Sequence, residues 1–480
     1  MKKIISWLIL TTVVFASPVF PAEGCEGKTH ACRYETVRIR ELPVSVQCWT
    51  FRKYTFVESL DKIRALGVRY VEAYPGQMLG GKYKDVPFTP ERVTDEHIRW
   101  VKEELARRGL TLVTYGVCNW ENTEEATRAY FEFAKKLGIR TLNTEPRFDD
   151  FTLIEQMVRE YDIRVAIHNH PKPTPYWDPQ TVIDRIKGLD PRIGSGADTG
   201  HWMRAGVNPL AALRRLRGRI TNVHLKDLNA FDDPGAYDVP FGTGAGKIRS
   251  ILAELTLQDY DGFIAVEHER HEDLPDPSDQ IRQGLEYIRS VTHYQDFEQL
   301  LGRRNGRYHK HGWNHYGPGH FELDEKSGVL KGQGGMGLFW FSAKKFRDFV
   351  LELEFRCEDH YTNSGVFLRV PDMPVSDDYI HRSHEIQIDN ASRGIHQTGA
   401  VYDAVAPSSL AFHEAGEWNH YRITFRGMRL TVELNGVQII DWEAGPRGKV
   451  KSIAREGYIG LQNHDSRSPV YFRNVFVKEL

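Results

Sequence analysis

The sequence predicts two folded domains, a (β/α)₈ barrel of the TIM type followed by an all-β jelly-roll sandwich. Up to about residue 295, short apolar runs alternate with amphipathic helical segments. Beyond residue 310 the helical period almost disappears, and strand-like alternation replaces it. The length of 480 residues agrees with this division, because roughly 100–200 residues per domain predicts two or three domains.

Eight apolar runs of strand length define the first domain. They are Leu42–Cys48, Tyr70–Ala73, Leu110–Val117, Thr141–Thr144, Val165–Ile167, Ile193–Ala197, Ile220–Leu225 and Phe263–Val266. The amphipathic segments that follow them are Phe56–Leu66, Thr94–Arg108, Glu124–Leu137, Leu153–Tyr161, Pro179–Ile186, Pro209–Leu216, Ile248–Leu255 and Asp279–Val291. Eight such units in about 250 residues are typical of a TIM barrel. A doubly wound open sheet is the alternative, but no glycine-rich phosphate loop follows the first strand.

The second domain is expected to consist of antiparallel strands. Its alternating segments are Phe349–Phe355, Gly365–Val370, Glu385–Ile388, Trp418–Phe425, Arg429–Leu434, Val437–Trp442, Gly457–Gln462 and Val470–Val477. Asn435-Gly436 is a strong signal for a two-residue hairpin turn. Residues 296–310 are polar and basic and are predicted to be a linker. The domains are therefore expected at 38–295 and 311–480.

Residues 1–16 have the pattern of a secretory signal peptide. Lys2 and Lys3 precede a short apolar run, Ile4–Phe15, and Ala16 supplies a small residue for cleavage. The run is shorter than the about 20 residues of a membrane-spanning helix, and no later stretch qualifies, so no transmembrane segment is predicted. We expect a bacterial periplasmic or secreted protein. Lipidation at Cys25 is the less favoured alternative.

Charge and cysteine content exclude several classes of protein. The net charge is −2, which gives no support to a nucleic-acid partner, because such proteins normally carry a basic surplus. The five cysteines are an odd, sparse set without a C-x-x-C motif, so neither a disulfide scaffold nor a cysteine metal site is expected. Cys25 and Cys32 are near neighbours, and an oxidising compartment would allow them to pair. The oligomeric state stays open.

The ends of the eight predicted strands carry an unusual number of metal-type ligands. TIM barrels place their sites at the carboxyl ends of the strands. These positions are Gln47, Glu72, Tyr115, Glu145, His168, Asp198, His224 and Glu267. Carboxylate and imidazole without cysteine suit a divalent ion such as Mn²⁺, Mg²⁺, Co²⁺ or Zn²⁺. We therefore expect a metal site built from Glu145, His168, Asp198, His224 and Glu267.

The local motifs resemble the xylose-isomerase-like sugar isomerase/epimerase superfamily over roughly residues 42–292. The motifs are VAIHNHP (165–171), ADTGHW (197–202), VHLKD (223–227) and VEHE (266–269). The resemblance implies metal ligands at the ends of the last four strands, and Asp198, His224 and Glu267 match three of them. His168 stands where many members have Glu, as it does in inosose-dehydratase-like members with a His-rich fifth strand; Glu145 is the other candidate.

The resemblance also bears on the reaction. The acid and base Glu pair of the epimerases is not evident, which disfavours simple epimerisation. The neutral charge and the export signal disfavour the endonuclease IV branch. His168 and Lys226 are the candidates for proton transfer, although Lys226 has Asp227 as an alternative ion-pair partner. The other expected pocket residues are Glu72, Tyr115, His170 and His201. Two roles are equally open for His201: it could orient one of the metal ligands, or it could only cap its turn.

The second domain resembles the 3-keto-disaccharide hydrolase family, which has a concanavalin-like jelly-roll fold. The motifs are NSGVFLR (363–369), HEIQID (384–389) and GLQNH (460–464). Glu385, Gln387 and Asp389 alternate along one strand and therefore share a face. The residues expected to complete a sugar groove there are Asn363, Arg369, Gln462 and His464. Glu385 and His464 are the catalytic candidates, and a lectin-like groove without chemistry is the alternative.

The resemblance implies a small-molecule substrate, a glycoside oxidised to the ketone at sugar C3. Such a ketone makes the C2 proton acidic, so that a base can remove it and the C1 glycosidic bond can leave by β-elimination. Water adding to the product completes a net hydrolysis. Two alternatives are a metal-dependent sugar isomerase or epimerase with a carbohydrate-binding module, and a pure binding protein.

Overall fold

A computed structural model describes residues 34–121, 123–270, 274–304, 307–464, 466–467 and 469–480. The predicted signal peptide, Cys25 and Cys32 lie outside the described residues. The chain divides into two compact units, one extending to Ile288 and the other comprising Arg289–Leu480. In the part of the chain that the structure describes, no helix is long and apolar enough to cross a membrane. Cys48, Cys118 and Cys357 are buried free thiols.

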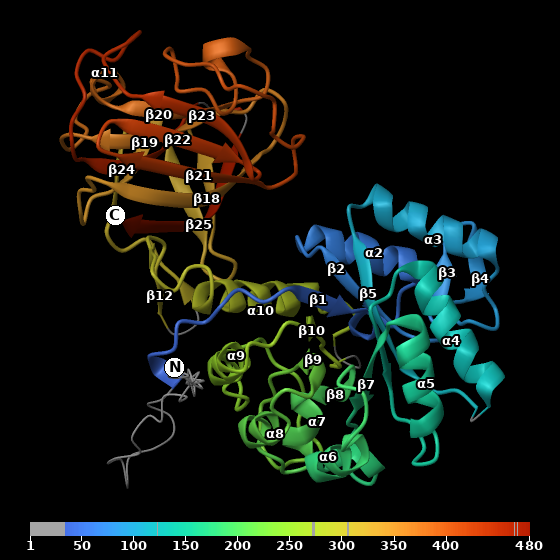
Figure 1. The fold of residues 1–480 in the computed structure, drawn as a ribbon. Coiled ribbons are helices and arrows are strands. Elements are labelled where there is room, and N and C mark those ends of the chain that lie inside the picture. The colour runs from blue at the N-terminus through green and yellow to red at the C-terminus, as the bar shows by residue number, and fades with distance from the viewer. Residues whose placement is uncertain (1–33, 122, 271–273, 305–306, 465, 468) are drawn as a thin grey trace, which may run out of the picture. The chain divides into compact units, whose positions relative to one another are not determined.

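The first unit is the predicted barrel of eight parallel strands. The strands are β1 (Val44–Gln47), β2 (Tyr70–Ala73), β5 (Thr111–Cys118), β6 (Thr141–Thr144), β7 (Arg164–His168), β8 (Ile193–Asp198), β9 (Ile220–Leu225) and β10 (Ile264–Val266). They pair in chain order, and β10 closes the barrel on β1 (Figure 1). The strands lie where the apolar runs predict them, because strands covered by helices are buried on both faces.

Helices surround the barrel (Figure 1). They are α2 (Phe56–Ala65), α3 (Asp95–Arg107), α4 (Glu124–Leu137), α5 (Phe151–Tyr161), α6 (Pro179–Ile186), α7 (Thr199–Arg204), α8 (Pro209–Arg215), α9 (Ile248–Leu257) and α10 (Ser278–Val291). Local signals set their ends: Thr55 and Glu58 form a capping box at the start of α2, and Gly138 closes α4 with a φ of 78°. The short helix α7 and the hairpin of β3 (Met78–Gly80) and β4 (Tyr83–Pro87) are not predicted by the periodicity.

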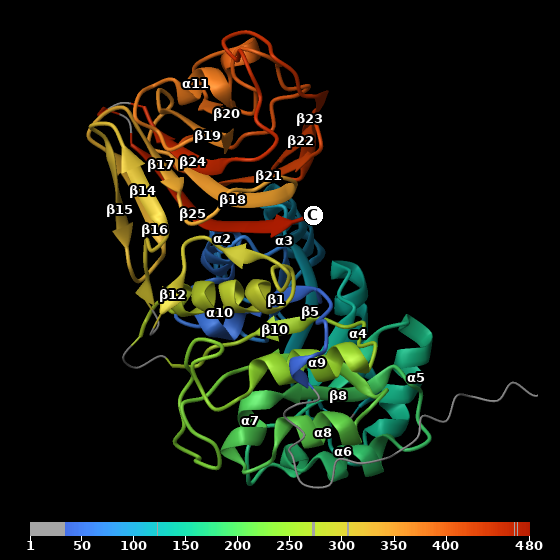
Figure 2. The same cartoon turned by 90° about the vertical axis from the view of Figure 1, so that its left-hand side faces the viewer.

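The second unit is an antiparallel sandwich. One sheet has the order β15-β16-β25-β18-β21-β22-β23 and the other the order β14-β17-β24-β19-β20. Figure 2 shows β18, β21 and β25 in one layer and β19, β20 and β24 in the other. The strands are β14 (Trp313–Tyr316), β15 (His320–Asp324), β16 (Val329–Gln333), β17 (Gly337–Phe341), β18 (Phe349–Cys357), β19 (Asn363–Val370), β20 (His384–Asp389), β21 (Asn419–Arg426), β22 (Arg429–Leu434), β23 (Val437–Glu443), β24 (Tyr458–Asn463) and β25 (Val470–Glu479).

Inward side chains from both sheets form one core. Leu353 of β18 and Val366 of β19 are fully buried in it. Asn435 and Gly436, with φ values of 52° and 80°, form the hairpin turn between β22 and β23 that their sequence predicts.

Residues 296–310 are not the linker that their polar composition suggests. Glu298–Gln299 (β11) pairs with β25, and Arg303–Arg304 (β12) pairs with Arg307–Tyr308 (β13). Leu300 and Leu301 are almost completely buried in the core of the sandwich. The segment is part of the second unit, because these two apolar side chains anchor an otherwise polar stretch.

Candidate functional site

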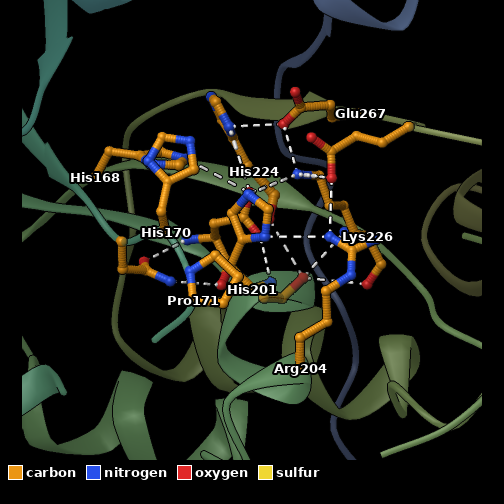
Figure 3. Close-up of polar contacts among 12 residues, drawn as sticks. His168, His170, Pro171, His201, Arg204, His224, Lys226 and Glu267 are labelled. Atoms are coloured by element: carbon orange, nitrogen blue, oxygen red, sulfur yellow. Dashed lines mark hydrogen bonds and ion pairs between the residues drawn. The ribbon is translucent and has the colours of Figure 1, made fainter. Parts of the chain in front are cut away.

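The carboxyl ends of the barrel strands surround a cavity of about 300 Å³, a volume at the lower end of ligand sites, which measure about 300–1,000 Å³. Its lining residues are Gln47, Trp49, Tyr74, Pro75, Gly116, Val117, His168, His170, His201, His224, Glu267 and Glu269. Figure 3 shows the four histidines, Lys226 and Glu267 together in one region. The predicted location of the site is therefore also the location of the cavity.

Asp198, His224 and Glu267 form a set that could hold a metal ion. One ligand atom of each lies within 4.8 Å of the others. His224 Nδ1 is 2.8 Å from Glu267 Oε2 and 3.7 Å from Asp198 Oδ2. Both atoms are buried and neither makes a well-formed hydrogen bond to a described residue, although they face each other at 2.8 Å and Lys226 Nζ lies 3.1 Å from Glu267 Oε2. Buried polar atoms nearly always have partners, so a divalent ion fits these residues.

Glu72 orients the imidazole of His224. Its Oε1 lies 2.8 Å from His224 Nε2, and its Oε2 accepts from Asn222 at 3.1 Å. A proton held on Nε2 by this carboxylate leaves the lone pair of Nδ1 facing Asp198 and Glu267. The sequence predicts that Glu72 lines the cavity. Its side chain is instead fully buried behind His224 and is not part of the cavity lining.

His168, rather than Glu145, lies beside Asp198. His168 Nε2 is 3.5 Å from Asp198 Oδ2, and its Nδ1 is 3.6 Å from Glu145 Oε1. Glu145 accepts from the backbone N–H of His170 and contacts the imidazole Nδ1 of that residue, both at 2.8 Å. Burial raises the pKa of Glu145, but the imidazoles of His168 and His170 outweigh it and bring the pKa below its ordinary value.

Lys226 is fully buried among carboxylates. Its Nζ is 2.8 Å from Asp198 Oδ2, 3.1 Å from Glu267 Oε2 and 3.0 Å from Glu269 Oε2. Burial alone lowers the pKa of Lys226, but the neighbouring carboxylates raise it well above its ordinary value. Asp227 is not its partner, because that carboxylate accepts backbone N–H groups of the glycine-rich loop, including that of Gly246 at 2.8 Å.

The remaining predicted barrel residues divide into two groups. His170 and His201 line the cavity. The His201 N–H also donates to Asp198 Oδ1 at 2.7 Å, which begins α7. Tyr115 does not line the cavity: its ring packs on Phe88 and Phe133, and its hydroxyl donates to the Phe88 carbonyl. Its side chain points outward from β5 because side chains alternate along a strand.

Three of the cavity residues that the strand ends do not predict have charged or aromatic side chains. Glu269 contacts Lys226 and also Arg204, whose guanidinium donates to it at 2.8 Å. Trp49 and Tyr74 meet edge to face with ring centroids 4.9 Å apart at the wall of the cavity. Only their position in the sequence could have predicted Trp49 and Tyr74, because each lies shortly after a strand that ends at the site.

The second unit has a smaller groove of about 140 Å³ on the sheet that contains β19, β20 and β24. Its lining residues are Met336, Asn363, Ile380, Glu385, Gln387, Tyr402, Lys449, Gln462 and His464. Asn363, Glu385, Gln387, Gln462 and His464 lie there as predicted. Tyr402 and Lys449 come from loops outside the predicted strands, and Lys449 Nζ lies 3.1 Å from the Tyr402 hydroxyl.

Glu385 is a buried carboxyl group with an exposed fraction of 6%. Burial raises its pKa to about 8, although the charge of Lys449 opposes the increase. Gln387, in the amide orientation that satisfies both of its ends, donates to Glu385 Oε1 at 3.2 Å. Gly365 makes room for the carboxyl group, because a Cβ there would lie 1.9 Å from Glu385 Oε1.

Two predicted groove residues lie elsewhere. Asp389 caps a turn, where its carboxylate accepts the N–H groups of Ala391 and Ser392 at 2.9 and 3.0 Å. Arg369 is buried away from the groove, over the ring of Phe425 at 3.7 Å. The pairing of β19 with β24 shifts register at this point and Arg369 has a φ of 55°, so the bulge redirects its side chain.

The barrel is similar to a known protein family and to inosose dehydratases. The family described as xylose isomerase-like TIM barrel matches residues 60–291. Inosose dehydratase of Lacticaseibacillus casei is 24% identical over 283 residues, which cover 49% of this chain and 90% of that protein. Inosose dehydratase of Geobacillus kaustophilus is 33% identical over 129 residues, which cover 23% of this chain and 42% of that protein.

A solved structure and a second family also match the chain. An uncharacterized protein from Parabacteroides distasonis is 32% identical with a TM-score of 0.44, and the match covers 52% of this chain and 99% of that one. The family described as 3-keto-alpha-glucoside-1,2-lyase-like domain matches residues 296–478. The chain therefore joins a xylose isomerase-like TIM barrel to a 3-keto-alpha-glucoside-1,2-lyase-like domain.

Proposed function

We propose that the chain cleaves 3-keto-glycosides in two steps, an elimination in the groove of the sandwich and a hydration in the barrel. The observation that carries this proposal is Glu385, a buried carboxyl group with a pKa of about 8 in a polar groove. A carboxylate that is costly to ionise is a stronger base than an exposed one, which suits removal of a proton next to a ketone. The match to a 1,2-lyase-like domain favours the same reaction.

In the first step the Glu385 carboxylate takes the proton from C2 of the 3-keto-sugar. The electron pair of the C2–H bond forms the C1=C2 double bond, the bond from C1 to the aglycone oxygen breaks, and this oxygen leaves as an alcohol once protonated. The amides of Asn363 and Gln462 line the groove and provide donors for the ketone oxygen, where negative charge develops.

In the second step water adds across the double bond in the barrel. The hydroxyl group joins C1 and a proton joins C2, so that the products of both steps are a 3-keto-sugar and the free aglycone. A divalent ion held by Asp198, His224 and Glu267, together with His168, supplies a Lewis acid for the ketone oxygen when it is bound. Lys226 Nζ lies 3.4 Å behind His201 Nε2, and His201 lines the same cavity. The dehydratases that resemble the barrel catalyse loss of water, which is the reverse kind of reaction.

The metal-type clusters favour this assignment of steps. Within the described residues, all clusters of His, Asp and Glu side chains that could hold a metal ion lie in the barrel. Purified full-length protein should therefore release aglycone from a 3-keto-glucoside with or without EDTA. With EDTA the unsaturated keto-sugar should accumulate and be visible by its ultraviolet absorbance. If no aglycone appears under either condition, the proposal fails.

A second candidate is a metal-dependent isomerase or epimerase whose sandwich only binds carbohydrate. It is favoured by one observation, that every residue lining the barrel cavity belongs to the first unit. This candidate predicts turnover of free sugars that is unchanged in Glu385→Gln. The two-step proposal instead predicts that Glu385→Gln stops the release of aglycone while leaving hydration of the isolated unsaturated product intact.

We also propose that the protein is exported. Support comes from Lys2, Lys3 and the apolar run that ends before Ala16. Expression in a Gram-negative host should give a periplasmic product that lacks the first 16 residues, as determined by N-terminal sequencing. Full-length protein in the cytoplasm would contradict export, and a lipid on Cys25 would support the less favoured lipoprotein alternative.

A further inference from the structure

We propose that the barrel binds a second divalent ion through Glu145, His168 and His170, beside the ion assigned to Asp198, His224 and Glu267. Each of these two sets can bring one ligand atom per residue within 4.8 Å of the others. The inference concerns ion binding alone and does not depend on the proposed reaction.

The geometry of the second set suits an ion. Glu145 Oε1 lies 2.8 Å from His170 Nδ1 and 3.6 Å from His168 Nδ1. Ligand atoms that bind one ion at about 2.1 Å lie roughly 3 to 3.5 Å apart. The two distances bracket this range, so small side-chain rotations bring all three atoms to one ion.

His168 provides the independent observation. Its side chain is 2% exposed, and its Nδ1 makes no hydrogen bond to any described residue. The nearest carboxylate oxygen, at 3.6 Å, is too distant for a hydrogen bond. A buried polar atom without a partner costs about 1–3 kcal/mol. An ion between Nδ1 and Glu145 supplies the missing partner.

The ring of His168 separates the two sets. Its Nε2 faces Asp198 Oδ2 at 3.5 Å, while Nδ1, on the other side of the ring, faces Glu145. The labelled rings of His168, His170, His201 and His224 share one region at the end of the barrel (Figure 3). The two candidate sets thus lie on opposite sides of one ring, and His168 can contribute one nitrogen to each.

The donor atoms indicate which ions the second site takes. Two imidazole nitrogens and one carboxylate favour a transition ion such as Zn²⁺, Co²⁺ or Mn²⁺, whereas Mg²⁺ prefers oxygen. The first set has two carboxylates and one imidazole among its three closest ligands. Mg²⁺ should therefore fill at most the first site.

The test is the number of ions bound per chain. Untagged full-length protein is stripped with chelator, reloaded with Zn²⁺, desalted and measured by elemental analysis. We expect two ions per chain in the wild type, one in His170→Ala, one in Glu145→Gln and one in Asp198→Asn. A matched control is His396→Ala, which removes an exposed histidine 3.5 Å from Asp403 in the second unit and should leave two ions.

A single ion in the wild type overturns the proposal, as do two ions in His170→Ala. The His170 side chain is 41% exposed, so this variant should fold even if Glu145→Gln does not, and thermal unfolding verifies it. As a second readout, wild type loaded with Mn²⁺ should give a spin-coupled electron paramagnetic resonance signal that His170→Ala lacks. Loss of one ion without loss of keto-glycoside cleavage, or the reverse, separates this inference from the proposed reaction.

Discussion

Replacing Glu385 by Gln tests whether the buried carboxyl group acts as the base. The groove supplies a carboxyl group with a pKa of about 8, so about a tenth of the molecules carry the carboxylate at pH 7 and about a hundredth at pH 6. The elimination rate of the wild type should therefore rise about tenfold from pH 6 to 7 and level off above pH 9. The elimination rate of Glu385→Gln should be about 10²–10⁴-fold lower than that of the wild type, because general base catalysis contributes a factor of this size.

The same pKa makes a prediction about stability that does not involve a substrate. A carboxyl group ionises near pH 4.3 in an unfolded chain but near pH 8 in the folded groove. The folded state thus holds a proton that the unfolded state releases, and stability is lost as the pH rises from about 4 to 8. The loss is about 5 kcal/mol at pH 9. Glu385→Gln should remove this dependence, so that the variant resists urea better than the wild type at pH 9 and equally at pH 4.

The assay compares aglycone release and urea unfolding across pH for wild type, Glu385→Gln and Glu456→Gln. Glu456 is an exposed glutamate of the same unit, and its replacement should change neither measurement. The reasoning is refuted if Glu385→Gln keeps the wild-type elimination rate. It is equally refuted if the difference in stability between this variant and the wild type does not increase with pH.

Three further substitutions test the remaining geometry. Glu72→Gln removes the carboxylate behind His224 Nε2 and should weaken metal binding about 10–100-fold in a calorimetric titration; unchanged affinity would show that another group orients the imidazole. Gly365→Ala places a Cβ against the buried carboxyl group of the groove and should cost about 1–3 kcal/mol of unfolding free energy. Gly445→Ala, which meets nothing within 4 Å, is its control, and equal stability of the two variants would argue against the crowding. Lys226→Met leaves buried carboxylates without their ammonium partner, which should destabilise the metal-free protein by about 3–5 kcal/mol; added Zn²⁺ should recover part of this loss, and a melting temperature equal to that of the wild type would contradict it.

Local patterns were sufficient to predict the barrel and the location of its site. Each strand is a short apolar run, and its last residue lies at the carboxyl end of the barrel whatever the detailed packing. For this reason Asp198, His224 and Glu267 could be predicted to converge from the sequence alone. The same holds for the alternation that places Glu385 and Gln387 on one face of β20.

Patterns failed where the side-chain direction depends on register. Arg369 is expected in the groove, yet the bulge in β19 redirects it into the interior. Tyr115 lies near the end of a predicted strand but points outward against Phe88. The strands β14 to β17 are not among the predicted ones, and in Trp313–Tyr316 and His320–Asp324 polar residues obscure the alternation.

The sequence by itself determined the two folds, the strand-end ligands and the polar groove, since periodicity and strand ends are properties of neighbouring residues. Only the tertiary structure decided that Glu72 stands behind His224, that Lys226 lies among three carboxylates and that His168 separates two candidate ion sets. These relations join residues far apart in the chain. They are set by the closure of the barrel and by burial, which forces each charged group to find a partner, and no local pattern specifies which partner it finds.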